Sequence, residues 1–182
     1  MEVTVNRILV TILLSAASLA VSGRGLAQRP PDTTPAQREA MRKLSFLAGN
    51  WSGPVSFAMG PGEPLHLTQT EKIEYKLDGL VLLIEGKSTA ADGTAPFQAL
   101  ATVAYDDATH TYRIRAYNAG HYIDAELTVL ADGFSWSFDS GPAHIANSMH
   151  LSPKGEWQET SDVTFGGNPP HRSVDMLLTH QQ

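Results

Sequence analysis

The sequence predicts an all-β fold, a ten-stranded antiparallel up-and-down barrel with one short N-terminal helix. From Trp51 onward apolar residues alternate with polar ones, and turn signals such as Asp78-Gly79 and Asp132-Gly133 divide the chain into ten segments. No later segment has the length and period of a second long helix, which argues against parallel βαβ architectures. Ten strands in an open sheet would leave two unpaired edges, and closure into a barrel removes them. A two-sheet sandwich is the alternative.

The first residues have the pattern of a secretory signal peptide. Arg7 precedes the apolar run ILVTILLSAASLAV, and Gly25 and Ala27 are small residues at the positions that a signal peptidase reads. We expect cleavage after Ala27, with an uncleaved N-terminal anchor as the alternative. Residues 28–34 then form an extended, proline-rich lead-in, and residues 35–182 form a single barrel domain.

The one helix is expected at about residues 35 to 48. Thr34 is the candidate N-cap, and Pro35 fits the first helical position. Gln37 stands where a capping box requires it, and Gly49 ends the helical pattern.

Composition restricts the compartment and the partners. The chain has no cysteine, so an exported protein of this kind has neither disulfides nor a lipid-modified cysteine, which fits a periplasmic or secreted protein. The formal net charge of -6 and the lack of a visible basic patch argue against nucleic acid as a partner. They also argue against a membrane surface as a partner once the signal peptide is removed. The sequence carries no indication of the oligomeric state.

The most informative positions are polar residues that share the apolar face of a predicted strand. Gln69 and Glu71 do so on the second strand, and Glu159 does so on the ninth. An unpaired carboxylate in a dry core costs several kcal/mol, so these groups need partners, water or a ligand. We therefore expect an internal cavity. The candidate ligand-binding residues are Gln69, Glu71, Tyr75, Tyr105, Trp136, Asn147, Trp157 and Glu159.

A purely structural explanation of the same polar residues stays open. Glu71 and Glu159 would then lie wet near the rim, or pair with Arg172, which shares the phase of the apolar residues of the tenth strand. Arg113 and Arg115, by contrast, are expected to face outward beside acidic residues of the next strand.

A tryptophan at the head of the first strand is expected to close one end of the barrel. Gly49 lets the chain turn sharply out of the helix, and Trp51 can then cover the barrel end as an apolar plug. The pattern Gly49-x-Trp51 resembles the one shared by lipocalins and related calycin barrels. The segments KLSFLAGNWSG, LDGLVLLIEGKS, ALATVAYDDATHTYRIRAYNAG and DAELTVLADGFSWSF together resemble a family of secreted bacterial proteins of unknown function, related to nitrobindin-type barrels.

This resemblance covers roughly residues 40 to 180 and implies a ten-stranded barrel with an internal pocket, but no known reaction. Nitrobindins hold haem through a late histidine. Among the late histidines, His180 alone shares the inward phase, and it lies two residues from the end of the sequence. A frayed terminus is a poor place for an axial ligand, so no cofactor is expected.

The sequence favours binding over catalysis. It lacks the GxSxG, HExxH, Walker and dinucleotide motifs, and its histidines lack the spacing of a metal site on one element. The favoured function is an exported carrier or sensor of a small, mostly apolar molecule. One alternative is a small enzyme in which Glu71 or Glu159 acts as acid or base. The other is a scaffold that binds nothing in its interior.

Overall fold

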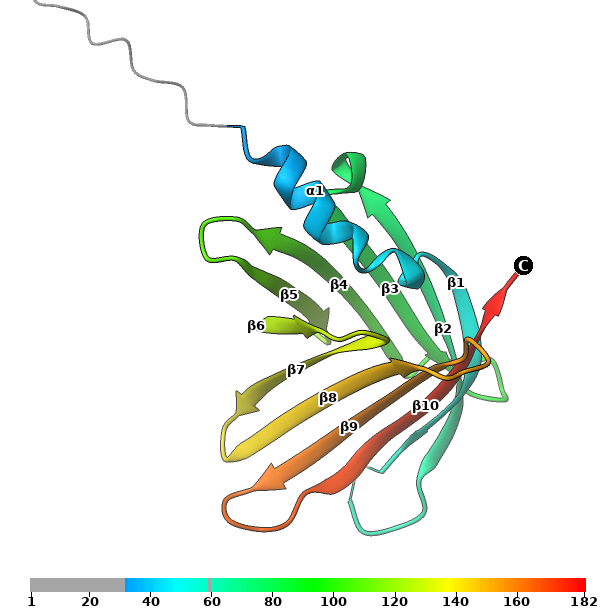
Figure 1. The fold of residues 1–182 in the computed structure, drawn as a ribbon. Helices are drawn as coiled ribbons and strands as arrows, with labels where there is room; N and C mark the ends of the chain where they lie inside the picture. Colours follow the sequence, from blue (N-terminus) through cyan, green and yellow to red (C-terminus); the bar gives the residue numbers. More distant parts are fainter. Residues whose placement is uncertain (1–31, 59) are drawn as a thin grey trace, which may run out of the picture. The chain divides into compact units, whose positions relative to one another are not determined.

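The structure is a computed structural model that describes residues 32–58 and 60–182. Ten antiparallel strands form a closed barrel in which each strand pairs with its sequence neighbours and β1 pairs with β10 (Figure 1). The predicted all-β, ten-stranded up-and-down barrel with one short helix is therefore confirmed. The predicted signal peptide, residues 1–27, and residues 28–31 of the predicted lead-in lie outside the described residues.

The strands follow the expected order and are separated by short turns. They are β1 (Gly49–Phe57), β2 (Leu65–Lys76), β3 (Val81–Thr89), β4 (Phe97–Asp106), β5 (Thr111–Asn118), β6 (His121–Val129), β7 (Gly133–Ser140), β8 (Ala143–Leu151), β9 (Trp157–Phe165) and β10 (His171–Gln181). A short 3-10 turn, η2 (Leu77–Gly79), joins β2 to β3.

The helix is shorter than predicted. The α-helix α1 (Thr34–Arg42) ends six residues before the predicted limit, and a separate 3-10 turn, η1 (Ser45–Leu47), follows. The physical reason is the spacing of the buried side chains: Met41, Leu44 and Leu47 lie three residues apart, and a 3-10 turn places such residues on one side. The predicted N-cap is also displaced, because the residue before the helix is Thr33.

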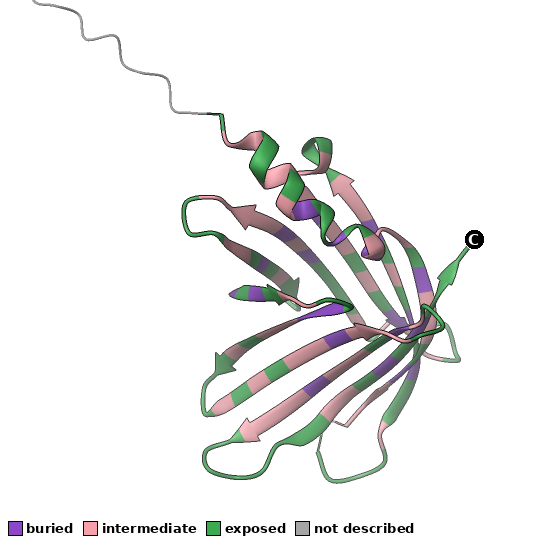
Figure 2. Cartoon of the chain, in the orientation of Figure 1, coloured by how far each residue is buried: buried purple, intermediate pink, exposed green. Residues whose placement is uncertain are grey.

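One end of the barrel is tightly packed beneath α1. Trp51, Phe134 and Trp157 are buried, and their rings meet edge to face with centroids 5.6 Å apart for the two tryptophans. Met41 and Leu44 of the helical segment cover this layer, and Figure 2 shows buried positions both on α1 and along the strands. The cavities described below must therefore lie toward the other end of the barrel.

Two local irregularities change the predicted faces. β6 and β7 pair over three residue positions, between Leu127–Val129 and Phe134–Trp136, and then diverge (Figure 1). In β10 a bulge between Arg172 and Val174 shifts the register. The predicted inward phase of Arg172 is therefore wrong: its guanidinium lies outside the barrel, 2.6 Å from Asp162.

The outward face of β5 and β6 agrees with its prediction. Arg113 and Arg115 both bind the carboxylate of Asp124 from the neighbouring strand. These groups are solvent-exposed, so the pairs contribute little to stability. None of the helices within residues 32–58 and 60–182 has the length and hydropathy that a membrane-spanning helix requires.

Candidate functional site

Two adjacent cavities lie inside the barrel, below the packed aromatic layer. The inner cavity has a volume of about 140 Å³ and borders Phe134, Trp136 and Trp157. The outer cavity has a volume of about 190 Å³ and extends toward the end of the barrel away from α1, where Phe57 and Phe97 stack with centroids 4.6 Å apart. The two cavities share four lining residues, which are Glu71, Gly86, Ala99 and Glu159.

Glu71 reaches into the barrel from β2 and is held by a short chain of hydrogen bonds. The side-chain amide nitrogen of Gln69 donates to Oε1 of Glu71 at 2.7 Å, and the hydroxyl of Ser88 donates to the side-chain oxygen Oε1 of Gln69. Gln69 and Ser88 are both buried. The second oxygen of Glu71, Oε2, is buried and has no hydrogen-bond partner among the described residues. One face of this carboxyl group is thus free to meet a ligand.

Glycine at position 86 makes room for this carboxyl group. Gly86 of β3 lies directly opposite Glu71 in the strand register. A Cβ atom at position 86 would lie 2.8 Å from Oε1 and 2.9 Å from Oε2 of Glu71, closer than such contacts normally occur. Any larger residue would displace the carboxyl group from its present position.

Glu159 enters from β9, on the other side of β1 and β10. The indole nitrogen of Trp157 donates to its Oε2 at 2.8 Å. Glu159 lines the same two cavities as Glu71, and its charge is one of the causes that raise the pKa of Glu71. The two carboxyl groups therefore act on each other across the cavity.

Burial raises the pKa of both carboxyl groups toward or above neutral pH. Loss of hydration raises the pKa of Glu71 to about 8, with the charge of Glu159 adding to the shift and the Gln69 hydrogen bond opposing it. Burial likewise raises the pKa of Glu159 to about 7, opposed by the Trp157 hydrogen bond. Because the two groups interact, protons leave them as a coupled pair.

Five of the eight predicted ligand-binding residues come together at the two cavities. These are Gln69, Glu71, Trp136, Trp157 and Glu159.

Tyr75 and Tyr105, the two tyrosines predicted as cavity walls, lie elsewhere. Tyr75 donates its hydroxyl to the carbonyl of Met41 at 2.6 Å and so fixes the end of α1. Tyr105 packs edge to face on Tyr112 at the same end of the barrel, and neither Tyr75 nor Tyr105 borders the two cavities.

Asn147 occupies an intermediate place. It lies opposite Trp136 and Ser161 in the strand register, and its Nδ2 is buried without a partner among the described residues. It borders a surface depression where β6 and β7 diverge, together with Trp136. Asn147 therefore lies beside the cavities and does not line them.

Trp51 and His180 meet at the packed end of the barrel. The indole nitrogen of Trp51 donates to the carbonyl of Leu47 at 2.8 Å, which ties the first strand to η1. The ring of His180 packs edge to face on Trp51, with centroids 4.9 Å apart, and the residue is exposed. His180 therefore lies outside the cavities. Among the described residues no three His, Asp or Glu side chains converge as a metal site would require.

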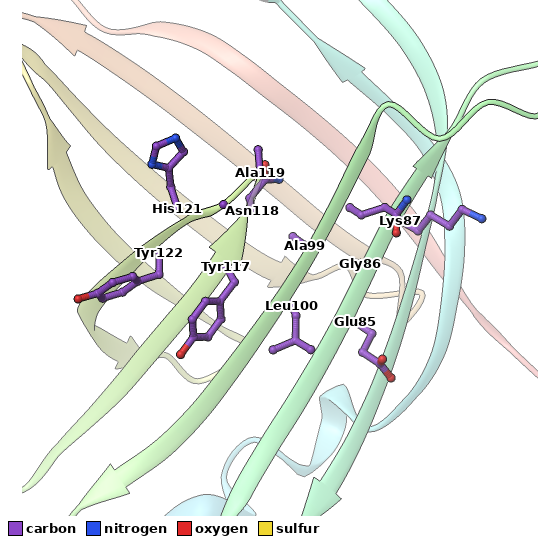
Figure 3. A pocket seen from close by; sticks show the side chains of 12 residues that line it. Glu85, Gly86, Lys87, Ala99, Leu100, Tyr117, Asn118, Ala119, His121 and Tyr122 are labelled. Carbon is purple, nitrogen blue, oxygen red and sulfur yellow. The ribbon is translucent and has the colours of Figure 1, made fainter.

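A further depression, about 670 Å³ in volume, lies on the outer surface of the barrel (Figure 3). Glu85, Leu100, Tyr117 and Tyr122 form a row across four neighbouring strands. Leu100, Tyr117 and Tyr122 are 38%, 43% and 65% exposed, so this surface stays open to water. A small molecule would be only partly desolvated there, which makes the interior cavities the better candidate site.

Sequence reasoning missed most of the cavity lining, and three of the missed residues surround the Glu71 carboxyl group or the shared wall of the cavities. Gly86, Ser88 and Ala99 line the outer cavity, and the sequence marks them only by their inward phase. A glycine within a strand is a weak sign of a close approach by another group, and this sign could have marked position 86.

Comparisons with known proteins support the fold and leave the function open. Residues 36–123 match a family model described as "Protein of unknown function (DUF1579)". The chain is also similar to the crystal structure of Rv2717c from M. tuberculosis, with a TM-score of 0.60 and 13% sequence identity over 79% of this chain and 98% of that chain. No match was found among curated protein sequences. The relation to lipocalins and nitrobindins stays a prediction, and the chain is similar to a barrel family of unknown function.

Proposed function

We propose that this protein binds a small, mostly apolar molecule in the interior of its barrel, as a carrier or sensor. The observation that carries the proposal is the pair of adjacent cavities whose common wall holds the carboxyl groups of Glu71 and Glu159. A scaffold protein gains nothing from hollow space and buried carboxyl groups, because both lower its stability. A ligand that fills the space and binds the carboxyl groups would offset this loss of stability.

The size of the cavities sets the size of the ligand. A cavity of roughly 150 Å³ holds one benzene ring in a protein interior. The inner and outer cavities, about 140 and 190 Å³, each match one such ring. Joined, they reach the lower end of the range for small-molecule sites, about 300 Å³. We therefore expect a ligand with one or two rings, or a short aliphatic chain.

The proposed place of action is outside the cytoplasm. The signal-like N-terminal sequence and the absence of cysteine from the chain support export to the periplasm or the medium. An exported carrier would protect an apolar molecule from water during transfer. Mass spectrometry of the protein purified from a periplasmic fraction tests this point, because cleavage after Ala27 gives a defined mass.

A cavity-filling variant tests the binding function. Prodan (6-propionyl-2-dimethylaminonaphthalene), a neutral probe with two fused rings, fluoresces more strongly and at shorter wavelength in an apolar pocket. We expect the wild type to bind it and Ala99→Phe to bind it at least tenfold more weakly, because Ala99 lines both cavities. Leu100→Phe is the matched control, since the next residue on β4 faces outward. Equal fluorescence from all three proteins, or none from the wild type, would refute the proposal.

Catalysis is the second candidate, and one observation favours it. The raised pKa values of Glu71, about 8, and Glu159, about 7, lie where a general acid or base works best. Carboxyl pKa values measured by NMR titration test the idea. Ordinary values near 4.5 for both groups would remove the reason to propose an enzyme.

A further inference from the structure

The two buried carboxyl groups have no cationic partner inside the barrel. No Lys, Arg or His of the described residues lines either cavity. Cations on the same or flanking strands turn outward: Lys72 binds Glu74 at 2.9 Å, Lys87 is exposed, and Arg172 binds Asp162. Among the described residues that line the cavities, the only titratable group facing each carboxyl group is therefore the other carboxyl group. A positive charge placed between the two groups would stabilise their ionised forms in this buried site.

Aromatic rings border the same space. Trp136 and Trp157 line the inner cavity together with Phe134, and Trp157 also donates a hydrogen bond to Glu159. Carboxylates accept the hydrogens of an ammonium group, and the faces of tryptophan rings attract its positive charge. The carboxylate oxygens and the ring faces together suit a protonated amine that is attached to an apolar body.

We infer that the interior site selects a small apolar molecule carrying one protonated amine, which Glu71 and Glu159 hold between them. The inference rests on the proposed binding function and specifies the class of its ligand. The free oxygen of Glu71, buried and without a partner among the described residues, is the acceptor for the amine. Gly86 keeps the space beside this oxygen open.

Proton release accompanies binding in this arrangement. In the free protein at pH 7 the coupled pair holds protons, because burial raises the pKa of each group. An arriving ammonium group keeps its own proton, because a primary alkylamine has a pKa of about 10 and stays protonated below that pH. It stabilises the ionised carboxylates, so their proton passes to the solvent. Affinity for the amine should therefore rise between pH 6 and pH 9, whereas affinity for a neutral ligand that accepts a hydrogen bond from a protonated carboxyl group should fall.

Three probes of matched size test the inference on the wild-type protein. They are 2-phenylethylamine, 2-phenylethanol and 3-phenylpropionate, followed by NMR titration at pH 6, 7, 8 and 9. We expect the amine to bind at least tenfold more tightly than the alcohol at pH 8, and the anion to bind most weakly. Calorimetry in two buffers of different ionisation enthalpy should record proton release on amine binding at pH 7.

Substitutions of the two carboxyl groups test whether these groups cause the preference for the amine. In Glu71→Gln and in Glu159→Gln the tenfold preference for the amine over the alcohol should shrink to about threefold or less, while the exposed Glu126→Gln on β6 should retain it. Because the comparison of probes on the wild type needs no variant, a folding failure of either variant leaves the test intact.

Each outcome distinguishes the inference from the proposed function. If Prodan binds in the interior but the alcohol binds as well as the amine, the inference is overturned and the binding function stands. If neither this probe nor any of the three matched compounds binds, both fail. An amine preference that survives in both variants would place the cation elsewhere and also overturn the inference.

Discussion

Glu71→Gln should change how the stability of the protein depends on pH. The pKa of the Glu71 carboxyl group rises from 4.5 to about 8 on folding, chiefly through loss of hydration. Between these values the unfolded chain has already lost a proton that the folded protein retains. Stability contributed by Glu71 is thus fully present below about pH 4.5 and is lost progressively up to about pH 8.

The size of the loss follows from the shift. Each pKa unit corresponds to about 1.4 kcal/mol, so the shift of Glu71 sets an upper limit of about 5 kcal/mol at pH 9. Water that enters the adjoining cavity solvates the carboxylate and reduces this figure, so we expect a loss of about 2 to 3 kcal/mol. A neutral glutamine at position 71 avoids this loss and still offers an oxygen to the amide of Gln69.

Urea unfolding followed by tryptophan fluorescence measures the effect, since Trp51 and Trp157 lie in the packed end of the barrel. At pH 5 the wild type and Glu71→Gln should have similar free energies of unfolding. At pH 9 the variant should be the more stable by about 2 to 3 kcal/mol. The exposed Glu126→Gln serves as the control and should follow the wild type throughout. A constant difference between wild type and Glu71→Gln from pH 5 to pH 9 would refute the reasoning.

Three further substitutions test other parts of the structure. Gly86→Ala places a Cβ against the Glu71 carboxyl group and should weaken interior probe binding at least tenfold, whereas Gly167→Ala, with open space around it, should leave binding unchanged. Trp51→Phe removes the donor to a buried carbonyl and should lower the free energy of unfolding by about 1 to 3 kcal/mol in urea; an unchanged midpoint contradicts this. Tyr112→Phe removes a 2.8 Å hydrogen bond to α1 and should cost about 1 kcal/mol. Hydrogen exchange should then accelerate in α1 more than in the barrel strands, and uniform acceleration would argue against a docking role.

The fold was predictable because its signals are local. Alternation of apolar and polar residues identified the strands, and turn residues separated them, so the number of strands and barrel closure followed. Backbone irregularities were not predictable in the same way. The bulge beside Arg172 turns this side chain from the inner to the outer side of the barrel. No residue of the segment predicts the bulge, because a bulge depends on the pairing of β10 with β9.

For the site residues, the sequence predicted which side chains face the barrel interior, but it did not predict their height along the barrel axis. Phase along a strand tells which side chains face inward, and Gln69, Glu71 and Glu159, which were selected by phase, line the outer cavity. It says nothing of height along the barrel axis. Tyr75 shares the phase of Glu71 yet lies four residues further along β2, at the end covered by α1, where its hydroxyl binds the helix. Height depends on the register of all ten strands together, which no single segment encodes.

Different parts of the barrel serve stability and the proposed binding. The end beneath α1 buries Trp51, Phe134 and Trp157 in a packed aromatic layer, and this burial stabilises the fold. The middle of the barrel instead holds two carboxyl groups whose ionisation opposes folding. Replacement of such groups by apolar residues of similar volume is often neutral or stabilising, so they are not needed to hold the fold together. Residues that lower stability and border a cavity are best explained by a ligand that meets them there, which is why Glu71 and Glu159 carry the functional proposal.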